Sequence, residues 1–360
     1  MYLILCRGIK ESLQHESMLR LRNDSSIRYE DMKRRLLYFL FAVVFIGILG
    51  FGGLLGVKNF QMKAEEVSNL SEAQQIVLLF GGDIMLDRGV EWAIKKNGGD
   101  WRWPFLKIAD TLHGADLVFG NLESQISDKG RNVGSRYSFR ADPKSMEGLV
   151  YAGFDVVSVA NNHSFDYTKE AFEDSLLRIK EAGIAYTGGG FSSQEAYFPA
   201  IREVKGIRVG FLGYTNSGSA SWSVKENQAG IVWTDWNTLE QLERDIQQAK
   251  RNVDILVVSL HGGEEYAKEP NEFQKAFAKT AIDAGANLII GHHPHVVQPL
   301  EQYQQGWIAY SLGNFVFDQY FSQETMRGAM LKAIVEKKTI KEVSLVKTKL
   351  NPSYQVELAE

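Results

Sequence analysis

Three of the chain's seven histidines lie within four positions, directly after the apolar run 288–290. Pro294 disfavours a helical backbone at His293, and in an extended backbone residues two apart point to the same side. We therefore expect His293 and His295 to direct their imidazole rings at one point. Neutral imidazoles are ligands that Zn, Mn and Fe ions accept. The spacing favours metal binding over the alternative, a histidine-rich surface loop.

Other apolar runs also end in side chains that can bind a metal or transfer a proton. In open α/β sheets, ligands bind beyond the carboxyl ends of the strands. If the runs are parallel strands, their end groups gather at one edge of a sheet. In chain order these groups are Asp83, Glu123, Asn161, Asn162, His163 and His261. Each alone could be a turn residue, a solvated acid or a structural histidine, but together they predict a metal site.

Three further acids leave alternatives open. Asp166 follows His163 by three positions, so it either caps the next helix or holds His163 by a hydrogen bond. Glu264 and Glu265 follow His261 by three and four positions. We interpret this glutamate pair as solvated side chains or as supports for the metal ligands.

These groups need a scaffold in which strands alternate with helices. Short apolar runs occur at 76–80, 116–119, 155–160, 209–212, 255–260, 288–290 and 308–311. Segments with helical period lie between several of them, at 169–182, 239–251 and 271–284. Gly183 and Gly285 follow two of these segments, as left-handed helix caps do. The alternation predicts an α/β fold with much parallel sheet, and the runs 330–336 and 343–350 predict an antiparallel pair closing it.

Composition excludes several classes of protein. The chain has 360 residues, a formal net charge of −4 and 23% charged residues, as a folded globular protein does. Without a strong basic excess to neutralise phosphates, nucleic acid is not expected as the main partner. Cys6 is the single cysteine, which rules out an intrachain disulfide and a thiolate metal site in the main body. A metal there must use His, Asp, Glu and Asn.

The N-terminal part predicts a membrane anchor. Residues 36–57 are free of charged side chains and follow Lys33, Arg34 and Arg35. A run of about 20 apolar residues spans a bilayer as a helix, and the preceding basic cluster predicts a cytoplasmic N-terminus. A cleaved signal peptide is the competing interpretation, although no A-x-A-like site follows the run directly. Translation from Met32 is a further hypothesis, because it leaves a short basic head before the run.

This pattern divides the chain into five parts. Residues 1–35 form a cytoplasmic segment, 36–57 a single transmembrane helix and 58–75 a linker. The main domain covers 76–350 and lies outside the cell membrane. Residues 351–360 form a tail.

At the candidate residues the sequence resembles a known family. The motifs GDIM at 82–85, GNLE at 120–123, ANNH at 160–163 with Asp166, HG at 261–262 and GHHPHV at 291–296 are similar to those of CapA-type poly-γ-glutamate capsule biosynthesis proteins. The segments 139–143, 153–157 and 311–315 also resemble that family. The likeness covers roughly residues 76–350. It implies the fold of calcineurin-like metallophosphoesterases: a four-layer αββα sandwich, with two β-sheets inside and helices outside.

The resemblance also implies roles for the candidate residues. Asp83 and His295 would bind one divalent ion, and Asn162, His261 and His293 a second, with Glu123 bridging the two. His163 would protonate a leaving group, with Asp166 beside it. Arg88 and Arg140 would clamp an anionic group of the substrate. Mn, Zn or Fe are the ions expected, one or two per site.

One position departs from the phosphoesterase pattern. Met85 stands where those enzymes place a second ligand, and a thioether is a poor ligand for Mn or Mg. The first site would then be weak, empty or completed by Asp87. This puts a full two-metal mechanism on a phosphoester in doubt.

Two main functions follow from the resemblance. The first is a metal-dependent hydrolase or transferase outside the cell, acting on a phosphoester or on an amide or ester bond of a polyanionic polymer. The second is a non-catalytic component that holds or exports poly-γ-glutamate beside membrane-embedded synthase subunits, with the metal binding its carboxylates. A signal-receiving ectodomain is a third, weaker hypothesis.

Overall fold

A computed structural model describes residues 75–359 of the chain. The predicted anchor at 36–57, the segment 1–35 and nearly all of the linker 58–75 lie outside the described residues. Within 75–359 none of the helices is both long enough and apolar enough to cross a membrane. The anchor therefore stays a prediction.

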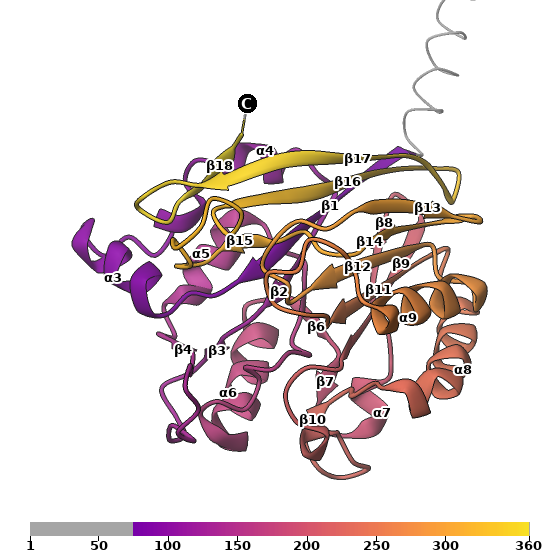
Figure 1. Cartoon of the computed structure of the whole chain (residues 1–360), viewed down its shortest axis with the longest axis horizontal. Helices are drawn as coiled ribbons and strands as arrows, with labels where there is room; N and C mark the ends of the chain where they lie inside the picture. Colours follow the sequence, from indigo (N-terminus) through magenta and orange to yellow (C-terminus); the bar gives the residue numbers. More distant parts are fainter. Residues whose placement is uncertain (1–74, 360) are drawn as a thin grey trace, which may run out of the picture. The chain divides into compact units, whose positions relative to one another are not determined.

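The first sheet is mixed, with the order β18-β17-β16-β1-β2-β5-β6 and β15 paired to β1 (Figure 1). Strands β1, β2, β5 and β6 run parallel, whereas β16, β17 and β18 are antiparallel neighbours at one edge. The strands are β1 Gln75–Ile84, β2 Leu117–Leu122, β5 Val156–Ser158, β6 Ala185–Thr187, β15 Asn314–Val316, β16 Arg327–Glu336, β17 Thr339–Leu350 and β18 Val356–Leu358.

The second sheet has the order β13-β14-β12-β11-β9-β8. Its four central strands are parallel, and the edge strands β8 and β13 pair antiparallel. Its strands are β8 Ala200–Val204, β9 Ile207–Thr215, β11 Ile255–His261, β12 Leu288–His292, β13 Leu300–Tyr303 and β14 Gly306–Ala309. Two short pairs, β3 Gln125–Ile126 with β4 Arg140–Ala141 and β7 Gly189–Gly190 with β10 Gly230–Ile231, lie apart from both sheets.

Helices cover the outer faces of both sheets (Figure 1). The α-helices are α3 Arg88–Lys96, α4 Ala109–His113, α5 Ser145–Ala152, α6 Thr168–Glu181, α7 Ser193–Ala196, α8 Leu239–Lys250 and α9 Glu272–Asp283. Short 3-10 helices are η1 Trp103–Phe105, η2 Ala220–Trp222 and η3 Trp236–Thr238. Helices α3 to α6 pack on the first sheet, and α8 and α9 pack on the second.

Alternation along the strands produces three apolar cores. In a strand, successive side chains point to opposite faces. Ile255 and Val257 of β11 therefore belong to the core between the two sheets, whereas Leu256 and Val258 pack under α8 and α9. The side chains of β1 alternate in the same way, and Leu78 faces the second sheet. The layers follow the order helix, sheet, sheet, helix.

These elements confirm the predicted α/β class. The predicted antiparallel pair is confirmed as β16 and β17, and Gly183 and Gly285 adopt the expected positive φ of 80° and 116°. The sheet continues further than expected, since β18 lies in the segment 351–360 that we assigned to a tail. The strand ends that carry the candidate site come from two sheets, whereas the sequence predicted a single edge.

Candidate metal centre

The predicted ligands meet at the carboxyl ends of parallel strands in both sheets. Across β1 and β2 the register places Asp83 beside Asn121, and Glu123 follows the last residue of β2. Across β11 and β12 it places His261 beside His292. Residues that are paired across two parallel strands lie side by side at the same end of the sheet. The fold thus delivers acids from one sheet and imidazoles from the other to one place.

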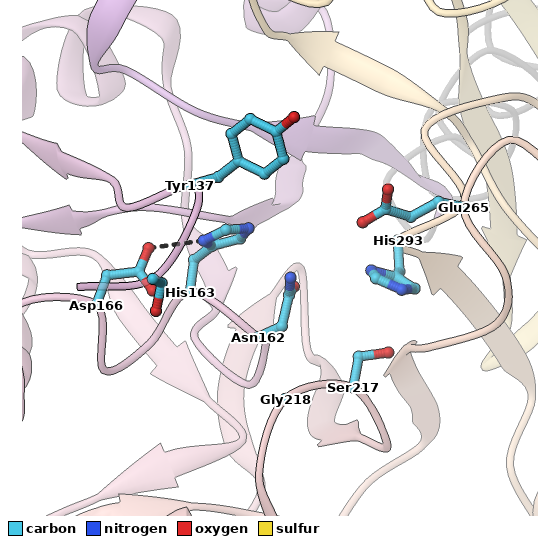
Figure 2. Close-up of a pocket in the computed structure, with 9 residues that line it drawn as sticks. Tyr137, Asn162, His163, Asp166, Ser217, Gly218, Glu265 and His293 are labelled. Atoms are coloured by element: carbon cyan, nitrogen blue, oxygen red, sulfur yellow. Dashed lines mark hydrogen bonds and ion pairs between the residues drawn. The ribbon is translucent and has the colours of Figure 1, made fainter. Parts of the chain in front are cut away.

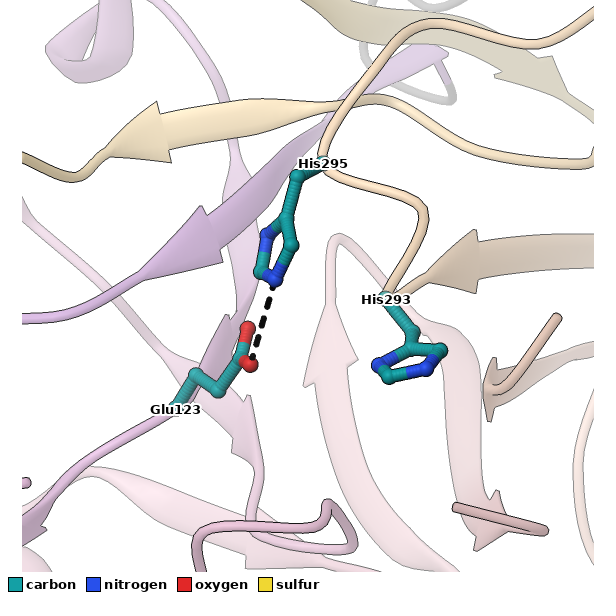
Figure 3. A group of neighbouring side chains, drawn as sticks. All are labelled: Glu123, His293 and His295. Carbon is teal, nitrogen blue, oxygen red and sulfur yellow. Dashed lines mark ion pairs between the residues drawn. The ribbon is translucent and has the colours of Figure 1, made fainter. Parts of the chain in front are cut away.

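Two overlapping groups of side chains have the geometry to hold a cation. Glu123, His293 and His295 offer ligand atoms that all lie within 4.8 Å of one another (Figure 3). The same holds for Asp83, Glu123 and His261. All five side chains are buried. Glu123 belongs to both groups, as a bridging carboxylate would. The other residues divide differently from the assignment that the family resemblance implied.

Asn162 joins this constellation through His261. Its Oδ1 lies 2.7 Å from Nε2 of His261. The same imidazole nitrogen lies 3.8 Å from Oε1 of Glu123. All six predicted metal ligands are therefore neighbours, and their separate roles stay predictions.

The backbone of the histidine segment differs from the prediction. His293 and His295 have φ angles of 96° and 58°, so the segment is a turn in the left-handed region and the extended backbone we expected there is wrong. Such angles are costly for residues with a side chain and persist where the surroundings enforce them, often at functional sites. One enforcing contact is the amide of His293, which donates to Oδ2 of Asp83 at 3.1 Å. The two rings still reach the same site, but by this route.

The backbone packs closely at two positions next to the site, one before Asp83 and one before His292. A Cβ at Gly82 would lie 1.9 Å from the carbonyl oxygen of Gly313, and one at Gly291 would lie 1.9 Å from that of Tyr310. Glycine is therefore required at both positions. The absence of side chains there lets Asp83 donate its amide to Gly313 at 3.0 Å.

Three residues that the sequence did not predict as ligands lie against the predicted ligands. Asn121 donates to Oδ1 of Asp83 at 2.8 Å and lies 3.1 Å from Nδ1 of His261. Nδ1 of His295 lies 3.0 Å from the side-chain oxygen of Asn314, which leaves Nε2 of His295 facing Glu123 at 3.8 Å. Such partners orient a metal-binding imidazole and fix its tautomer. His292, the third, places Nδ1 3.3 Å from Oδ1 of Asp83.

Several buried polar atoms at the centre lack a hydrogen-bond partner among residues 75–359. They are both carboxylate oxygens of Glu123, Nδ1 of His293 and both ring nitrogens of His292. A buried polar atom without a partner is costly. Carboxylate, amide and imidazole donors together suit a divalent ion such as Mn, Zn or Fe. The residues present therefore fit a cation, and the donor set does not choose among these metals.

Burial also controls the charge of these groups. Burial, followed by the charge of His295, lowers the pKa of His293 to about 3. Burial, followed by the charge of His293, holds the pKa of His261 well below its usual range. Both imidazoles are neutral at neutral pH, as metal ligands must be.

The pKa values of the two buried carboxyls, Asp83 and Glu123, shift in opposite directions. Burial opposes ionisation of Asp83, but the nearby His292 and His295 outweigh it and hold the pKa of Asp83 well below its usual range. Burial, and then repulsion from Asp83, raises the pKa of Glu123 well above its usual range. A cation between them would favour the ionised form of both carboxyls at once.

A His–Asp pair stands beside the ligands. Nδ1 of His163 lies 2.6 Å from Oδ2 of Asp166, and Nε2 lies 3.7 Å from Oε1 of Glu123. The ring of Phe139 covers one face of the imidazole at a centroid distance of 3.9 Å, and its amide donates to Oδ2 of Asp166 at 2.8 Å. Helix α6 begins after Tyr167, so Asp166 holds His163 rather than capping that helix. This settles the alternative left open by the sequence.

The pair opens onto a pocket of about 410 Å³ (Figure 2). Asn162 and His293 line it from the ligand set, and His163 lines it from the His–Asp pair. Tyr137 and Glu265 also line it. A substrate in this pocket would meet the ligands and the imidazole together.

The two predicted substrate clamps already have partners within the protein. Arg88 pairs with the carboxylate of Asp318, and its guanidinium carbon lies 4.5 Å from the ring centre of Phe139. Arg140 donates to the carbonyl oxygen of Lys129 at 2.8 Å. These contacts give both arginines a structural task, and their contact with a substrate stays a prediction.

Met85, at the position that departs from the phosphoesterase pattern, has a packing role. Met85 is fully buried in the core under α3, and its sulfur accepts the amide of Asp87 at 3.1 Å. The carboxylate of Asp87 caps α3 at the amide of Arg88 and accepts the amide of Arg140. Asp87 therefore already accepts hydrogen bonds from two backbone amides. This arrangement disfavours Asp87 as the additional ligand of the first site that the sequence suggested.

The model of the family described as Bacterial capsule synthesis protein PGA_cap matches residues 77–319. The chain belongs to this family. The CapA-type resemblance seen in the motifs is thereby confirmed.

Curated relatives of this PGA_cap member agree with the assignment. The chain is 35% identical over 253 residues to Capsule biosynthesis protein CapA of Bacillus anthracis, covering 69% of this chain and 61% of that protein. It is 30% identical over 313 residues to PGA biosynthesis protein CapA of Bacillus subtilis, covering 86% and 78%. The chain thus spans about three fifths of the length of the Bacillus anthracis relative. Among solved structures, a hypothetical protein from Thermus thermophilus is similar with a TM-score of 0.49 and 17% identity, over 76% of this chain and 99% of that one.

Proposed function

We propose that this protein acts in the synthesis of capsular poly-γ-glutamate as a metal-dependent hydrolase or transferase. The names of its Bacillus relatives, which refer to capsule and PGA biosynthesis, support the process. The apolar run 36–57 supports a single-pass anchor in the cell membrane, with the domain outside and the membrane-embedded synthase subunits as partners. The substrate is the anionic polymer or a phosphoester linked to it.

One observation carries the catalytic part of this proposal. Two of the predicted metal ligands, Asn162 and His293, line the same pocket as a hydrogen-bonded His163–Asp166 pair, and His293 belongs to a buried group of mutually close ligands. Structural histidines do not need an open pocket, and structural metal sites do not need a neighbouring acid–base pair. Both together suit a reaction in which a bond is broken beside a cation.

The chain's own residues then have distinct tasks. When bound, a divalent ion polarises a substrate oxygen and lowers the pKa of a bound water. The carboxylate of Asp166 accepts a hydrogen bond from Nδ1–H of His163 and stabilises the imidazolium, so that Nε2 donates its proton to the leaving oxygen or nitrogen. Phe139 blocks one ring face and restricts the imidazole to this orientation.

Met85 favours the second candidate function, a non-catalytic component that binds the polymer through the metal. A buried thioether replaces a ligand at the first site, so one ion is held with fewer donors than the other. A single well-held ion is sufficient to bind carboxylates. The same experiment separates the two functions.

The test uses the full chain, purified in detergent and loaded with Mn or Zn. His163→Ala should lower hydrolysis of phosphoester or γ-glutamyl substrates by about 10²- to 10⁴-fold, with unchanged metal content by mass spectrometry. His113→Ala is the matched control, because His113 is exposed and its Nε2 bonds a backbone carbonyl. Loss of the metal in His163→Ala would contradict the proposed acid. Metal-dependent polymer binding without any hydrolysis by the native protein would establish the second function instead.

A further inference from the structure

Glu265 occupies the pocket wall opposite the His163–Asp166 pair (Figure 2). It follows a tight turn, in which a Cβ at Gly262 would lie 1.9 Å from Oδ1 of Asn216 and Gly263 has a φ of 122°. The next amide, that of Tyr266, donates to the carbonyl oxygen of Pro294 at 2.8 Å. The loop that carries Glu265 is therefore tied to the histidine segment.

The pocket is acidic in a way that a polyanion would not favour. Its lining includes Glu265 and Asp166, and within residues 75–359 neither lysine nor arginine lines it. Two further carboxyls, those of Asp83 and Glu123, are buried nearby, with Oε1 of Glu123 3.7 Å from Nε2 of the lining residue His163. One divalent ion balances two of these four charges. The remaining carboxylates would repel a negatively charged chain that passed through the pocket.

Glu265 itself has no ion-pair partner within the described part of the chain. Every salt bridge found between residues 75 and 359 involves other acids, and the pocket lining also includes the neutral side chains of Ser135, Tyr137 and Ser217. A carboxylate without an ion-pair partner in the pocket would form a favourable ion pair with a cationic group of the substrate.

The chemistry of poly-γ-glutamate supplies such a cation at one place. Each interior unit carries an α-carboxylate and a neutral amide, and only the unit at the amino end carries an α-ammonium. We infer that Glu265 binds this terminal α-ammonium, so that the site acts on the amino end of the polymer rather than on its interior. This inference rests on the proposed function and adds to it the part of the substrate that is recognised.

The arrangement of the pocket agrees with end recognition. The terminal unit bears its ammonium and its α-carboxylate on the same carbon atom. Glu265 and the metal ligand His293 both line the pocket, so a single unit can meet a carboxylate with its ammonium and a cation with its carboxylate. A volume of about 410 Å³ lies in the range of small-molecule pockets, which suits a chain end better than a continuous polymer track.

The test compares two short γ-linked glutamate oligomers, one with a free amino end and one acetylated there. Binding to the metal-loaded full chain is measured by calorimetry. The native protein should bind the free oligomer about 10- to 100-fold more tightly, which is the usual value of a charge-assisted hydrogen bond. Glu265→Gln should remove this preference and leave binding of the acetylated oligomer unchanged. Glu264→Gln, the exposed neighbour that does not line the pocket, is the matched control and should behave as the native protein does.

Three outcomes would overturn the inference. Equal, metal-dependent binding of both oligomers would refute end recognition while leaving the proposed function intact. Loss of the metal in Glu265→Gln would make Glu265 a metal ligand instead. Absence of binding of either oligomer to the native, metal-loaded protein would refute the polymer as the substrate, and the inference with it, and would leave the phosphoester as the substrate of the proposed function.

Discussion

At the scale of single residues, Glu123 decides how the protein behaves with and without a metal. Its carboxyl is fully buried beside Asp83, and both of its oxygens lack hydrogen bonds within residues 75–359. Burial and the charge of Asp83 raise its pKa above the unfolded value. Its stabilising contribution is therefore present at low pH and is lost as the pH rises through the folded-state pKa. A bound cation removes this loss because it compensates both charges.

Glu123→Gln tests this account. At pH 8 the metal-free variant should melt above the metal-free native protein, by about 2–4 °C for each kcal/mol gained, whereas at pH 5 the two should melt alike. Added Mn or Zn should raise the Tm of the native protein and not that of the variant. Glu324→Gln, at an exposed surface ion pair, is the control. A variant that melted lower by the same amount at both pH values would contradict the explanation.

The residues that were predictable from the sequence share one property. Asp83, Glu123, His261 and the histidines after β12 lie at or just beyond the carboxyl ends of apolar strands, so position along the chain was sufficient to find them. Asn121, Asn314 and His292 were missed as partners because their contacts depend on strand register. Arg88 was assigned to the substrate because its ion pair with Asp318, 230 positions away, leaves no local signal.

At the scale of elements, the site depends on how closely β1 passes the segment before β15. The amide of Asp83 reaches the carbonyl oxygen of Gly313 because Gly82 has no side chain. Strand β15 then pairs with β1 and places Asn314 opposite Asp83. The contact therefore connects the first ligand with the partner of His295.

Gly82→Ala should separate these strands. A Cβ 1.9 Å from a backbone oxygen cannot be accommodated without movement, and we expect a loss of about 3 kcal/mol of stability together with weaker metal binding. Melting temperature and metal content measure the two effects. Gly114→Ala is the control, because its Cβ would meet its nearest atom at 3.3 Å. Unchanged stability in Gly82→Ala would show that the close approach is not required.

Element types were easier to predict than their arrangement. Apolar runs and glycine caps identified the helices α6, α8 and α9 and half of the described strands from local pattern alone, namely β1, β2, β5, β9, β11, β12, β14, β16 and β17. Local pattern does not show which strands share a sheet, so the single predicted edge became two facing edges. It also missed the left-handed turn at His293 and His295, because contacts from distant strands impose those angles.

At the scale of the whole molecule, the proposed topology can be tested with cysteine chemistry. Ser353 is exposed and Cys6 is the only native cysteine. In intact cells, a membrane-impermeant maleimide should label Ser353→Cys in a Cys6→Ser background and should leave the native chain unlabelled. After lysis, Cys6 should react if translation begins at Met1 and should be absent if it begins at Met32. Labelling of Cys6 but not of position 353 in intact cells would reverse the topology.

Asp83 and His293 are joined although 210 positions separate them, and they belong to opposite sheets. A nascent chain that has formed only β1, β2, β5 and β6 holds Asp83 and Glu123 without any of the imidazoles of the second sheet. Capture of an ion is therefore a late event in folding, which must wait until the C-terminal half has docked. If the domain matures outside the membrane, the supply of metal in that compartment, rather than in the cytoplasm, determines which ion the finished protein carries.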